Sequence, residues 1–182
     1  MTDMKKILVV IDCQNDFIDG SLRNEEAIAA VPRIVERISS FDGDEILVTM
    51  DTHSEDYLST KEGEKLPVEH CIKGTAGWEL NGDIAFEIQK AELRGIPVRV
   101  FEKPTFGSYD LAGHIRDIEG EPEIEFIGFC TDICVVSNVL MVKAAVFDRA
   151  VVKVDSACCA GVTPATHLAA LDTMRMCQVE II

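Results

Sequence analysis

The chain has 182 residues, of which 47% are apolar and 27% charged, and its formal net charge is −15 at pH 7. This length suits one domain with a substantial core, so we expect a single domain over residues 1–182. The negative charge argues against nucleic acid or an anionic membrane surface as a partner. No apolar run approaches the roughly 20 residues of a membrane helix, and the run "ILVVI" is too short for a signal peptide. The sequence therefore predicts a cytoplasmic protein.

Short β-branched runs alternate with helical stretches along the chain. The runs are almost continuously apolar, which predicts strands covered on both faces, at residues 6–12, 45–51, 97–103, 123–129, 150–156 and 177–182. Helices are expected at residues 32–41, 81–95, 108–120, 131–148 and 163–176. Alternation of this kind predicts a three-layer α/β fold with a six-stranded, mostly parallel sheet.

Two helix boundaries carry a physical reason. Proline fits a first helical position better than a helix interior, so the first helix is expected to begin at Pro32. Gly95 is well placed as a C-terminal cap. The stretch 131–148 is apolar nearly all round, which predicts burial in the core or in a subunit interface and favours a homo-oligomer. Residues 52–80 are long, polar and aperiodic, as loops that serve a site often are.

The seven cysteines do not form a disulfide framework in this interpretation. Their number is odd, and a cytoplasmic compartment is reducing. Most are expected to be small buried residues, with Cys13 and Cys177 in the core and Cys158 and Cys159 packing near the site.

Chemically active side chains follow four of the predicted strands. In a parallel sheet the carboxyl ends of the strands meet at one edge, where ligands bind. The residues at these ends are Asp12 after the first strand, Asp51 and His53 after the second, Lys103 after the third, and Cys130 and Cys134 after the fourth.

These residue types suit acyl transfer by a thiol. If Thr131 caps the following helix, Cys134 lies in its first turn, where the helix dipole and Lys103 favour a thiolate. A thiolate attacks carbonyl carbon, and Asp12 can accept the thiol proton and return it to the leaving group. Backbone N–H groups at the helix start can hold the oxyanion. The sequence therefore predicts a catalytic triad of Asp12, Lys103 and Cys134.

Three motifs carry a resemblance to a known family. They are "VVIDCQNDF" with Asp12, "EKPTFGS" with Lys103, and "GFCTDICV" with Cys134. In these the chain resembles the isochorismatase-like cysteine hydrolases over nearly its whole length, and most of all the nicotinamidases. The resemblance implies a sheet order of 3-2-1-4-5-6 and a non-proline cis peptide just before Cys130. It also implies an oxyanion hole made by the backbone N–H groups of Cys130 and Cys134.

The same resemblance implies a metal site. "DTH" at 51–53 and "HCIKGTAGW" at 70–78 are similar to the metal-binding part of nicotinamidases. This implies that Asp51, His53 and His70 bind a divalent ion, with zinc the first expectation and iron or manganese as alternatives. Either Glu62 or Glu64 is a candidate for a further ligand, and the sequence leaves that choice open.

The expected reaction is hydrolysis of a small amide through a thioester, with release of ammonia. The family suggests nicotinamide, converted to nicotinate in NAD salvage, with Phe17 and Phe106 binding the ring and Trp78 or Tyr109 as further candidates. Nicotinamidases often carry an aromatic residue shortly before the second metal histidine, whereas here that stretch is "KLPVEH".

Two alternatives stay open at this point. One is an amidase of the same family that acts on a carbamoyl or ureido compound. The other, of a different class, is a non-catalytic metal-binding module in which Cys130, Cys134, His53 and His70 form a closed site. That module leaves Asp12 and Lys103 without a role.

Overall fold

A six-stranded parallel sheet forms the centre of the molecule. The structure is a computed structural model that describes residues 4–182. The strands lie in the order β3-β2-β1-β4-β5-β6, and every neighbouring pair is parallel. They are β1 (Lys6–Ile11), β2 (Glu45–Asp51), β3 (Val98–Lys103), β4 (Glu123–Phe129), β5 (Val151–Ala160) and β6 (Glu180–Ile181). The predicted fold class and strand order are confirmed.

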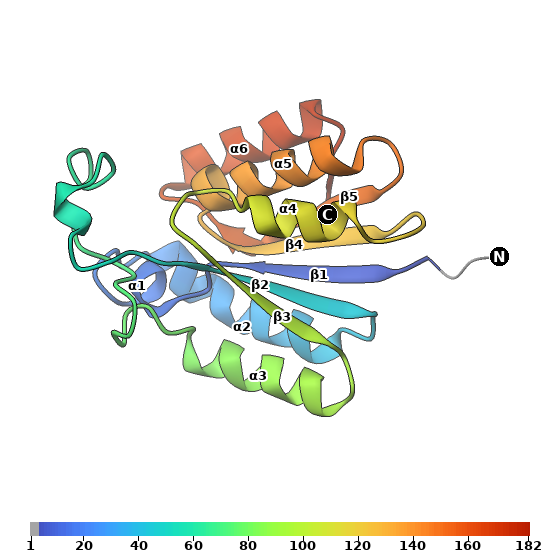
Figure 1. Ribbon diagram of the computed structural model, residues 1–182, viewed down its shortest axis with the longest axis horizontal. Coiled ribbons are helices and arrows are strands. Elements are labelled where there is room, and N and C mark those ends of the chain that lie inside the picture. Colours follow the sequence, from blue (N-terminus) through green and yellow to red (C-terminus); the bar gives the residue numbers. More distant parts are fainter. Residues whose placement is uncertain (1–3) are drawn as a thin grey trace.

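Helices cover both faces of this sheet. Figure 1 shows α2 and α3 on one face and α4, α5 and α6 on the other. The α-helices are α1 (Asn15–Ile18), α2 (Glu25–Ser40), α3 (Gly82–Leu93), α4 (Tyr109–Arg116), α5 (Val136–Val146) and α6 (Pro164–Met176). A 3₁₀ turn (Tyr57–Ser59) and a π-helical turn (Thr131–Val135) complete the regular elements.

The central strand β1 explains why the apolar runs are continuous. Ile7, Val9 and Ile11 pack into the core beneath α4, α5 and α6, whereas Leu8 and Val10 pack into the core beneath α2 and α3. Since successive side chains of a strand point to opposite faces, a strand between two helical layers needs apolar residues at every position.

Gly128 in β4 is the glycine that this packing requires most. Its φ is +120°, and a Cβ there would collide with the Ile11 backbone of β1. Only glycine fits such a conformation at so close an approach.

The expected start of the first long helix is wrong. α2 begins at Glu25, and the Asn24 side chain caps it by accepting a hydrogen bond from the Ala27 N–H. Pro32 therefore lies inside the helix, on its exposed side. Proline has no N–H to donate to the carbonyl of Ile28, but on this side water can satisfy that carbonyl.

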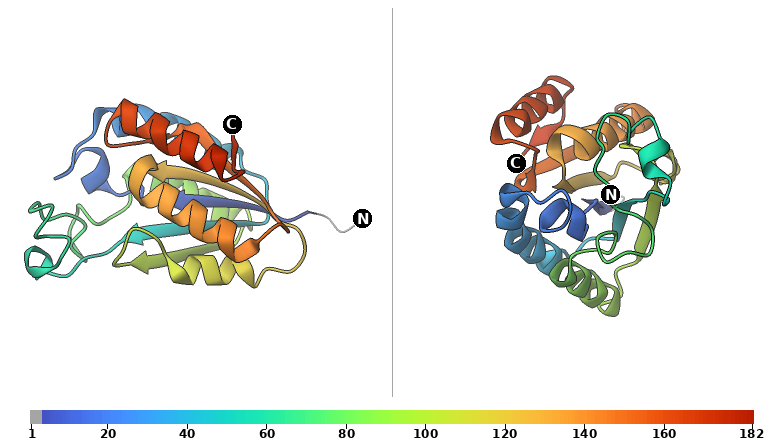
Figure 2. Two further views of the ribbon diagram at one scale, coloured as in Figure 1. Left: turned by 90° about the horizontal axis from the view of Figure 1, so that it is seen from above. Right: turned by 90° about the vertical axis from the view of Figure 1, so that its left-hand side faces the viewer.

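Residues 52–80 lie beyond the carboxyl ends of the strands. In Figure 1 and in the left view of Figure 2 they project past the end of the sheet that is opposite the chain's N-terminus. Apart from the 3₁₀ turn they form only isolated bridges, His53 to Ile72 and Leu80 to Gln14. This segment is thus placed to serve the edge at which the sequence predicts a site.

One side of the apolar helix α5 is buried within the chain. It packs between α4 and α6, as Figure 1 shows, and Val139, Val142 and Val146 belong to the core. The other large apolar residues of this helix, Val136, Leu140 and Met141, are only partly buried within the chain. None of the helices in residues 4–182 combines the length and the apolar character needed to cross a membrane.

Five of the seven cysteines are buried, in agreement with the expectation for most of them, and Cys158 and Cys159 lie within β5, which extends beyond the predicted strand. All seven are free, and Cys13, Cys158 and Cys159 are buried as predicted. Cys177 is exposed rather than part of the core. It terminates α6 at the turn to the short strand β6, so its side chain is left in solvent.

Candidate active site

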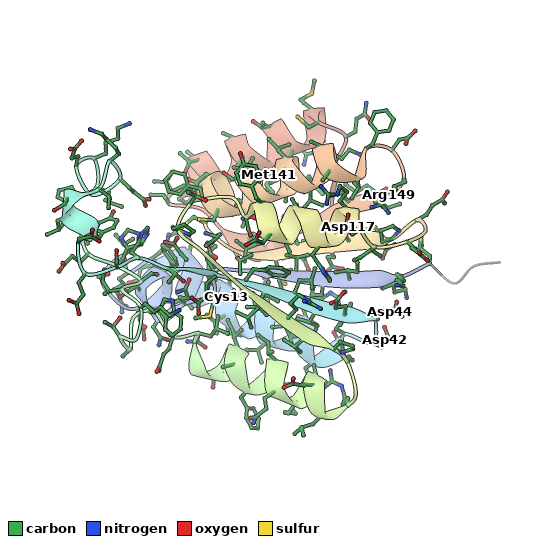
Figure 3. All side chains as sticks on the ribbon, in the orientation of Figure 1. Cys13, Asp42, Asp44, Asp117, Met141 and Arg149 are labelled. Atoms are coloured by element: carbon green, nitrogen blue, oxygen red, sulfur yellow. The ribbon has the colours of Figure 1, made fainter. Side chains whose placement is uncertain are left out.

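The carboxyl edge of the sheet brings the predicted residues together. Asp51 and Lys103 end the adjacent strands β2 and β3 and are direct register partners. Asp12 follows β1 with a φ of +46°, a left-handed conformation that aspartate tolerates better than most residues. Figure 3 labels its neighbour Cys13 at this end of β1, and Asp42 and Asp44 at the opposite end of the sheet.

Asp12, Lys103 and Cys134 form one buried cluster. The Lys103 Nζ lies 2.6 Å from Asp12 Oδ2 and 3.7 Å from Cys134 Sγ. Asp12 is fully buried, Lys103 is 2% exposed and Cys134 is 4% exposed. Asp12 Oδ2 has no other polar partner within residues 4–182, whereas Oδ1 accepts a 2.6 Å hydrogen bond from the Thr49 hydroxyl. The ammonium therefore bridges the carboxylate and the thiol.

Burial is the main influence on the pKa values in this cluster. It raises the pKa of Cys134 well above the usual range, the nearby Asp12 raises it further, and Lys103 lowers it. Burial likewise raises the pKa of Asp12, against the opposing effect of Lys103. Burial disfavours the Lys103 charge, but Asp12 and Cys134 together raise the pKa of that ammonium above its usual value. Burial and Asp12 thus favour the neutral form of the thiol, beside a carboxylate whose proton affinity is increased.

Gln14 is a buried residue near the site that the sequence interpretation missed. Its Nε2 donates hydrogen bonds of 2.8 Å to the carbonyls of Asp51 and Trp78, and its Oε1 accepts one of 2.7 Å from the Asp51 N–H. This one side chain fixes the backbone of Asp51 and ties it to the end of segment 52–80. Its position two residues after Asp12, in "DCQNDF", was the available signal.

The turn that carries Cys134 begins at a cis peptide. The bond between Phe129 and Cys130 is cis, as the resemblance implies. The Cys130 carbonyl accepts hydrogen bonds from the N–H groups of Ile133 and Val135. The Cys130 N–H makes no backbone hydrogen bond within residues 4–182. An N–H without a backbone partner, at the start of the turn that carries Cys134, is a candidate oxyanion donor.

Thr131 does not cap the helix, contrary to expectation. It is the first residue of the π-helical turn, and Cys130 occupies the cap position without a side-chain hydrogen bond. The Thr131 hydroxyl instead lies 2.8 Å from Nδ1 of His167 on α6. A long-range partner therefore replaces the local cap, and the Cys134 turn is joined to α6.

Asp51, His53 and His70 converge at the edge of the same site. Their ligand atoms all lie within 4.8 Å of one another. Asp51 Oδ2 is 3.0 Å from His53 Nε2 and 3.6 Å from His70 Nε2. His70 Nδ1 lies 2.8 Å from the Val68 carbonyl, which fixes the proton on Nδ1 and leaves Nε2 free for a ligand. Two imidazoles and a carboxylate are a donor set that suits zinc, iron or manganese.

The geometry separates the two candidate glutamates. Glu62 Oε1 lies 3.8 Å from the Nε2 atoms of both His53 and His70. Glu64 instead faces solvent, 3.3 Å from Lys61. Within residues 4–182 the group of converging metal donors contains no cysteine, so the closed site that combines cysteines and histidines does not form.

A pocket of about 690 Å³ opens onto these groups. Its wall includes Cys130, Cys134 and His70, together with the predicted ring-binding residues Phe17 and Phe106. Phe17 packs edge-on against His70, with ring centroids 5.8 Å apart.

The stretch before His70 contributes Leu66 to the pocket wall, in place of an aromatic residue. Neither Trp78 nor Tyr109 lines the pocket. Trp78 donates a hydrogen bond to the Thr52 hydroxyl, and Tyr109 is 85% exposed. The pocket wall is therefore less aromatic than the resemblance implies.

Comparison with known proteins decides the family. The model of the isochorismatase domain matches residues 6–182. The chain belongs to the isochorismatase family. A relative, the nicotinamidase/pyrazinamidase of Mycobacterium tuberculosis (strain ATCC 25618 / H37Rv), is 25% identical over 186 residues, 97% of this chain and 98% of its own length.

Solved structures agree with this assignment. The nicotinamidase/pyrazinamidase PncA from Bacillus subtilis superimposes with a TM-score of 0.80 at 26% identity, covering 98% of this chain and 99% of its own. The pyrazinamidase of Pyrococcus horikoshii, solved in complex with zinc, has a TM-score of 0.75 at 24% identity and covers 98% of both chains. This isochorismatase-family hydrolase thus shares its fold with nicotinamidases over almost its full length.

Proposed function

We propose that this isochorismatase-family hydrolase is a cysteine amidohydrolase that converts a small carboxamide, nicotinamide in the first place, to its acid and ammonia. One observation carries the proposal. An ammonium bridges a buried thiol and a buried carboxylate, at 3.7 Å and 2.6 Å, beneath a pocket of about 690 Å³. The nicotinamidase relatives support nicotinamide as the first substrate to test.

The first half-reaction forms a thioester. As the amide carbonyl enters the pocket, the thiol proton of Cys134 passes to Asp12 and Sγ bonds to the carbonyl carbon. The carbonyl electron pair moves to oxygen, and the Cys130 and Cys134 backbone N–H groups stabilise the resulting charge. Asp12 then protonates the amide nitrogen, the C–N bond breaks, and ammonia leaves.

The second half-reaction is hydrolysis of that thioester. Asp12, again a carboxylate, accepts a proton from a water molecule while the oxygen of that water bonds to the acyl carbon. The C–S bond breaks, Cys134 recovers its proton from Asp12, and the acid leaves. Lys103 stays charged throughout, because Asp12 and Cys134 raise the pKa of its ammonium. Its charge stabilises whichever neighbour is anionic.

A divalent metal would be held by Asp51, His53 and His70, with Glu62 close enough to complete or orient the set. When bound, such an ion supplies a Lewis-acid contact that can fix a ring nitrogen or a second polar group of the substrate. Asp51 Oδ1 lies 3.6 Å from the Lys103 Nζ, so this carboxylate also belongs to the electrostatic surroundings of the triad. Phe17, packed against His70, would bind a flat ring beside this position.

A second substrate class has specific support. The stretch before His70, where nicotinamidases often carry an aromatic residue, contributes Leu66 to the pocket wall. The pocket volume of about 690 Å³ is in the range of pockets that hold drug-sized ligands. Both features favour a bulkier or non-aromatic amide, such as a carbamoyl or ureido compound. The non-catalytic metal module is not proposed, because it explains neither Asp12 nor Lys103.

The test is ammonia release from a panel of amides, with nicotinamide and pyrazinamide first and carbamoyl and ureido compounds beside them. We expect turnover with at least one member that disappears in Cys134→Ala. Ammonia release that persists in Cys134→Ala would refute the mechanism. Turnover of only carbamoyl or ureido compounds would keep the mechanism and replace the substrate.

A further inference from the structure

Asn138 on α5 is a fully buried polar residue that the mechanism does not use. A buried amide is costly unless its donors and acceptor are paired. Its Nδ2 donates to the Cys134 carbonyl at 2.8 Å and to the Phe106 carbonyl at 3.0 Å. Its Oδ1 accepts a 2.9 Å hydrogen bond from the Ser108 N–H. Both N–H groups and the oxygen are therefore paired, each with the backbone.

The three partners come from two segments that meet at the pocket. Cys134 belongs to the π-helical turn after β4. Phe106 and Ser108 belong to residues 104–108, which connect Lys103 at the end of β3 to α4. Phe106 lines the pocket, and Ser108 caps α4 by accepting a hydrogen bond from the Leu111 N–H. One side chain thus joins the candidate nucleophile to a pocket wall.

The connecting segment also packs tightly against α5. A Cβ at Gly107 would collide with the sulfur of Met141, which Figure 3 labels on α5, and would touch Ser137. Thr105 stabilises the same turn, because its hydroxyl donates a 2.8 Å hydrogen bond to the Gly107 carbonyl. The position of residues 104–108 is therefore set by α5, and Asn138 provides the polar part of that contact.

We propose that Asn138 is a positioning residue that holds the Cys134 turn and the segment 104–108 in a fixed relative position. The sulfur of Cys134 and the pocket wall at Phe106 then contact the same bound substrate. This inference rests on the roles proposed above for Cys134 and Phe106. Asn138 touches neither substrate nor reacting atoms, and it acts through the backbone of both segments.

Side-chain reach explains why an asparagine is needed. A serine or threonine in a helix can donate to the carbonyl four residues earlier, but it has a single hydroxyl hydrogen. Threonine at position 138 would therefore keep a partner for Cys134 and lose both bonds to residues 106 and 108. Asparagine reaches both segments at once.

The decisive variant is Asn138→Thr, with Asn138→Ala beside it. Ser137→Ala is the matched control, because Ser137 is the preceding residue of α5 and donates a 2.6 Å hydrogen bond to the Ile133 carbonyl without bonding residues 104–108. Three quantities are compared across the variants. They are the exchange rate of the Ser108 amide relative to the Leu8 amide of the core strand β1, KM and kcat. Kinetics use nicotinamide, or the panel amide that releases ammonia fastest.

We expect Asn138→Thr to accelerate Ser108 exchange about tenfold relative to Leu8 and to raise KM about tenfold, with kcat within about threefold. Asn138→Ala, which also frees the Cys134 carbonyl, should in addition lower kcat about tenfold. Ser137→Ala should change none of these ratios.

Unchanged relative exchange at Ser108, or equal kinetic effects in Asn138→Thr and Ser137→Ala, would overturn the proposal and leave Asn138 an ordinary core residue. The exchange measurement needs no substrate. A failure of the proposed function, seen as wild-type protein that hydrolyses no amide, is therefore distinguishable from a failure of this inference.

Discussion

Replacing Lys103 by methionine tests the electrostatics of the proposed triad. The variant keeps an unbranched apolar side chain in a buried position but removes the charge 3.7 Å from Cys134 Sγ. At that separation a unit charge contributes about 4 kcal/mol at an effective dielectric constant of about 20, or roughly three pKa units. Asp12 offsets part of this, because a buried carboxylate that has lost its ion-pair partner takes up a proton. We therefore expect a net rise of about two units in the pKa of the thiol.

The sign and size of the effect follow from thiol chemistry. Below the pKa the thiolate fraction falls tenfold for each unit by which the pKa rises. A thiolate of higher pKa is more nucleophilic, which recovers roughly half of that loss on a logarithmic scale. Lys103→Met should thus lower the rate constant of Cys134 alkylation by iodoacetamide about tenfold at any pH below the thiol pKa.

The assay requires two controls. Cys177 is exposed, so the variants are made in a Cys177→Ser background and the labelled thiol is identified from peptide fragment masses. Lys61→Met removes the same charge from a side chain that is 91% exposed, and it should leave the rate constant unchanged. Equal alkylation rates in folded Lys103→Met and in the wild type would refute the triad.

Further predictions address the two thiols and the metal. Cys134→Ala should lower turnover by about 10³-fold or more, because a covalent nucleophile is lost. Cys130→Ala should keep most activity, since only the backbone N–H of Cys130 takes part in the reaction. Steady-state ammonia release measures both variants, and a larger loss in Cys130→Ala would mean that the nucleophile was assigned to the wrong thiol. Protein purified without chelator should hold about one zinc, iron or manganese per chain, and His53→Ala should lower this occupancy, as elemental analysis will show. Glu62→Gln should weaken metal affinity about tenfold or more while the exposed Glu64→Gln leaves it unchanged; equal affinities in metal titrations of the two variants would exclude Glu62 from the site.

The positions of the first four strands and the convergence of the candidate site residues were predictable for the same reason. The sheet is covered on both faces, so its strands read as continuous apolar runs that stop where the side chains change character. Asp12, Asp51 and Lys103 lie at the carboxyl ends of these apolar runs. Parallel pairing brings those ends to one edge of the sheet. The convergence of these candidate site residues could therefore be predicted from the topology.

What could not be predicted depends on contacts between distant segments. Thr131 was expected to cap a helix, a local role, but it pairs with His167, which is 36 residues away. Gln14 and Asn138 bind the backbone of other segments, and no pattern around a buried amide reveals its partners. The start of α2 was mispredicted from Pro32 for a different reason. At a solvent-facing position inside a helix, the loss of the hydrogen bond that proline cannot donate is tolerated.

The most direct measurement of the central claim is the intact mass of the protein quenched during turnover of nicotinamide, or of the panel amide that is hydrolysed. We expect a transient mass increase equal to one acyl group, located on Cys134 by peptide fragmentation and absent from Cys134→Ala. Turnover without such an adduct under rapid quenching, or an adduct on any other residue, would contradict it.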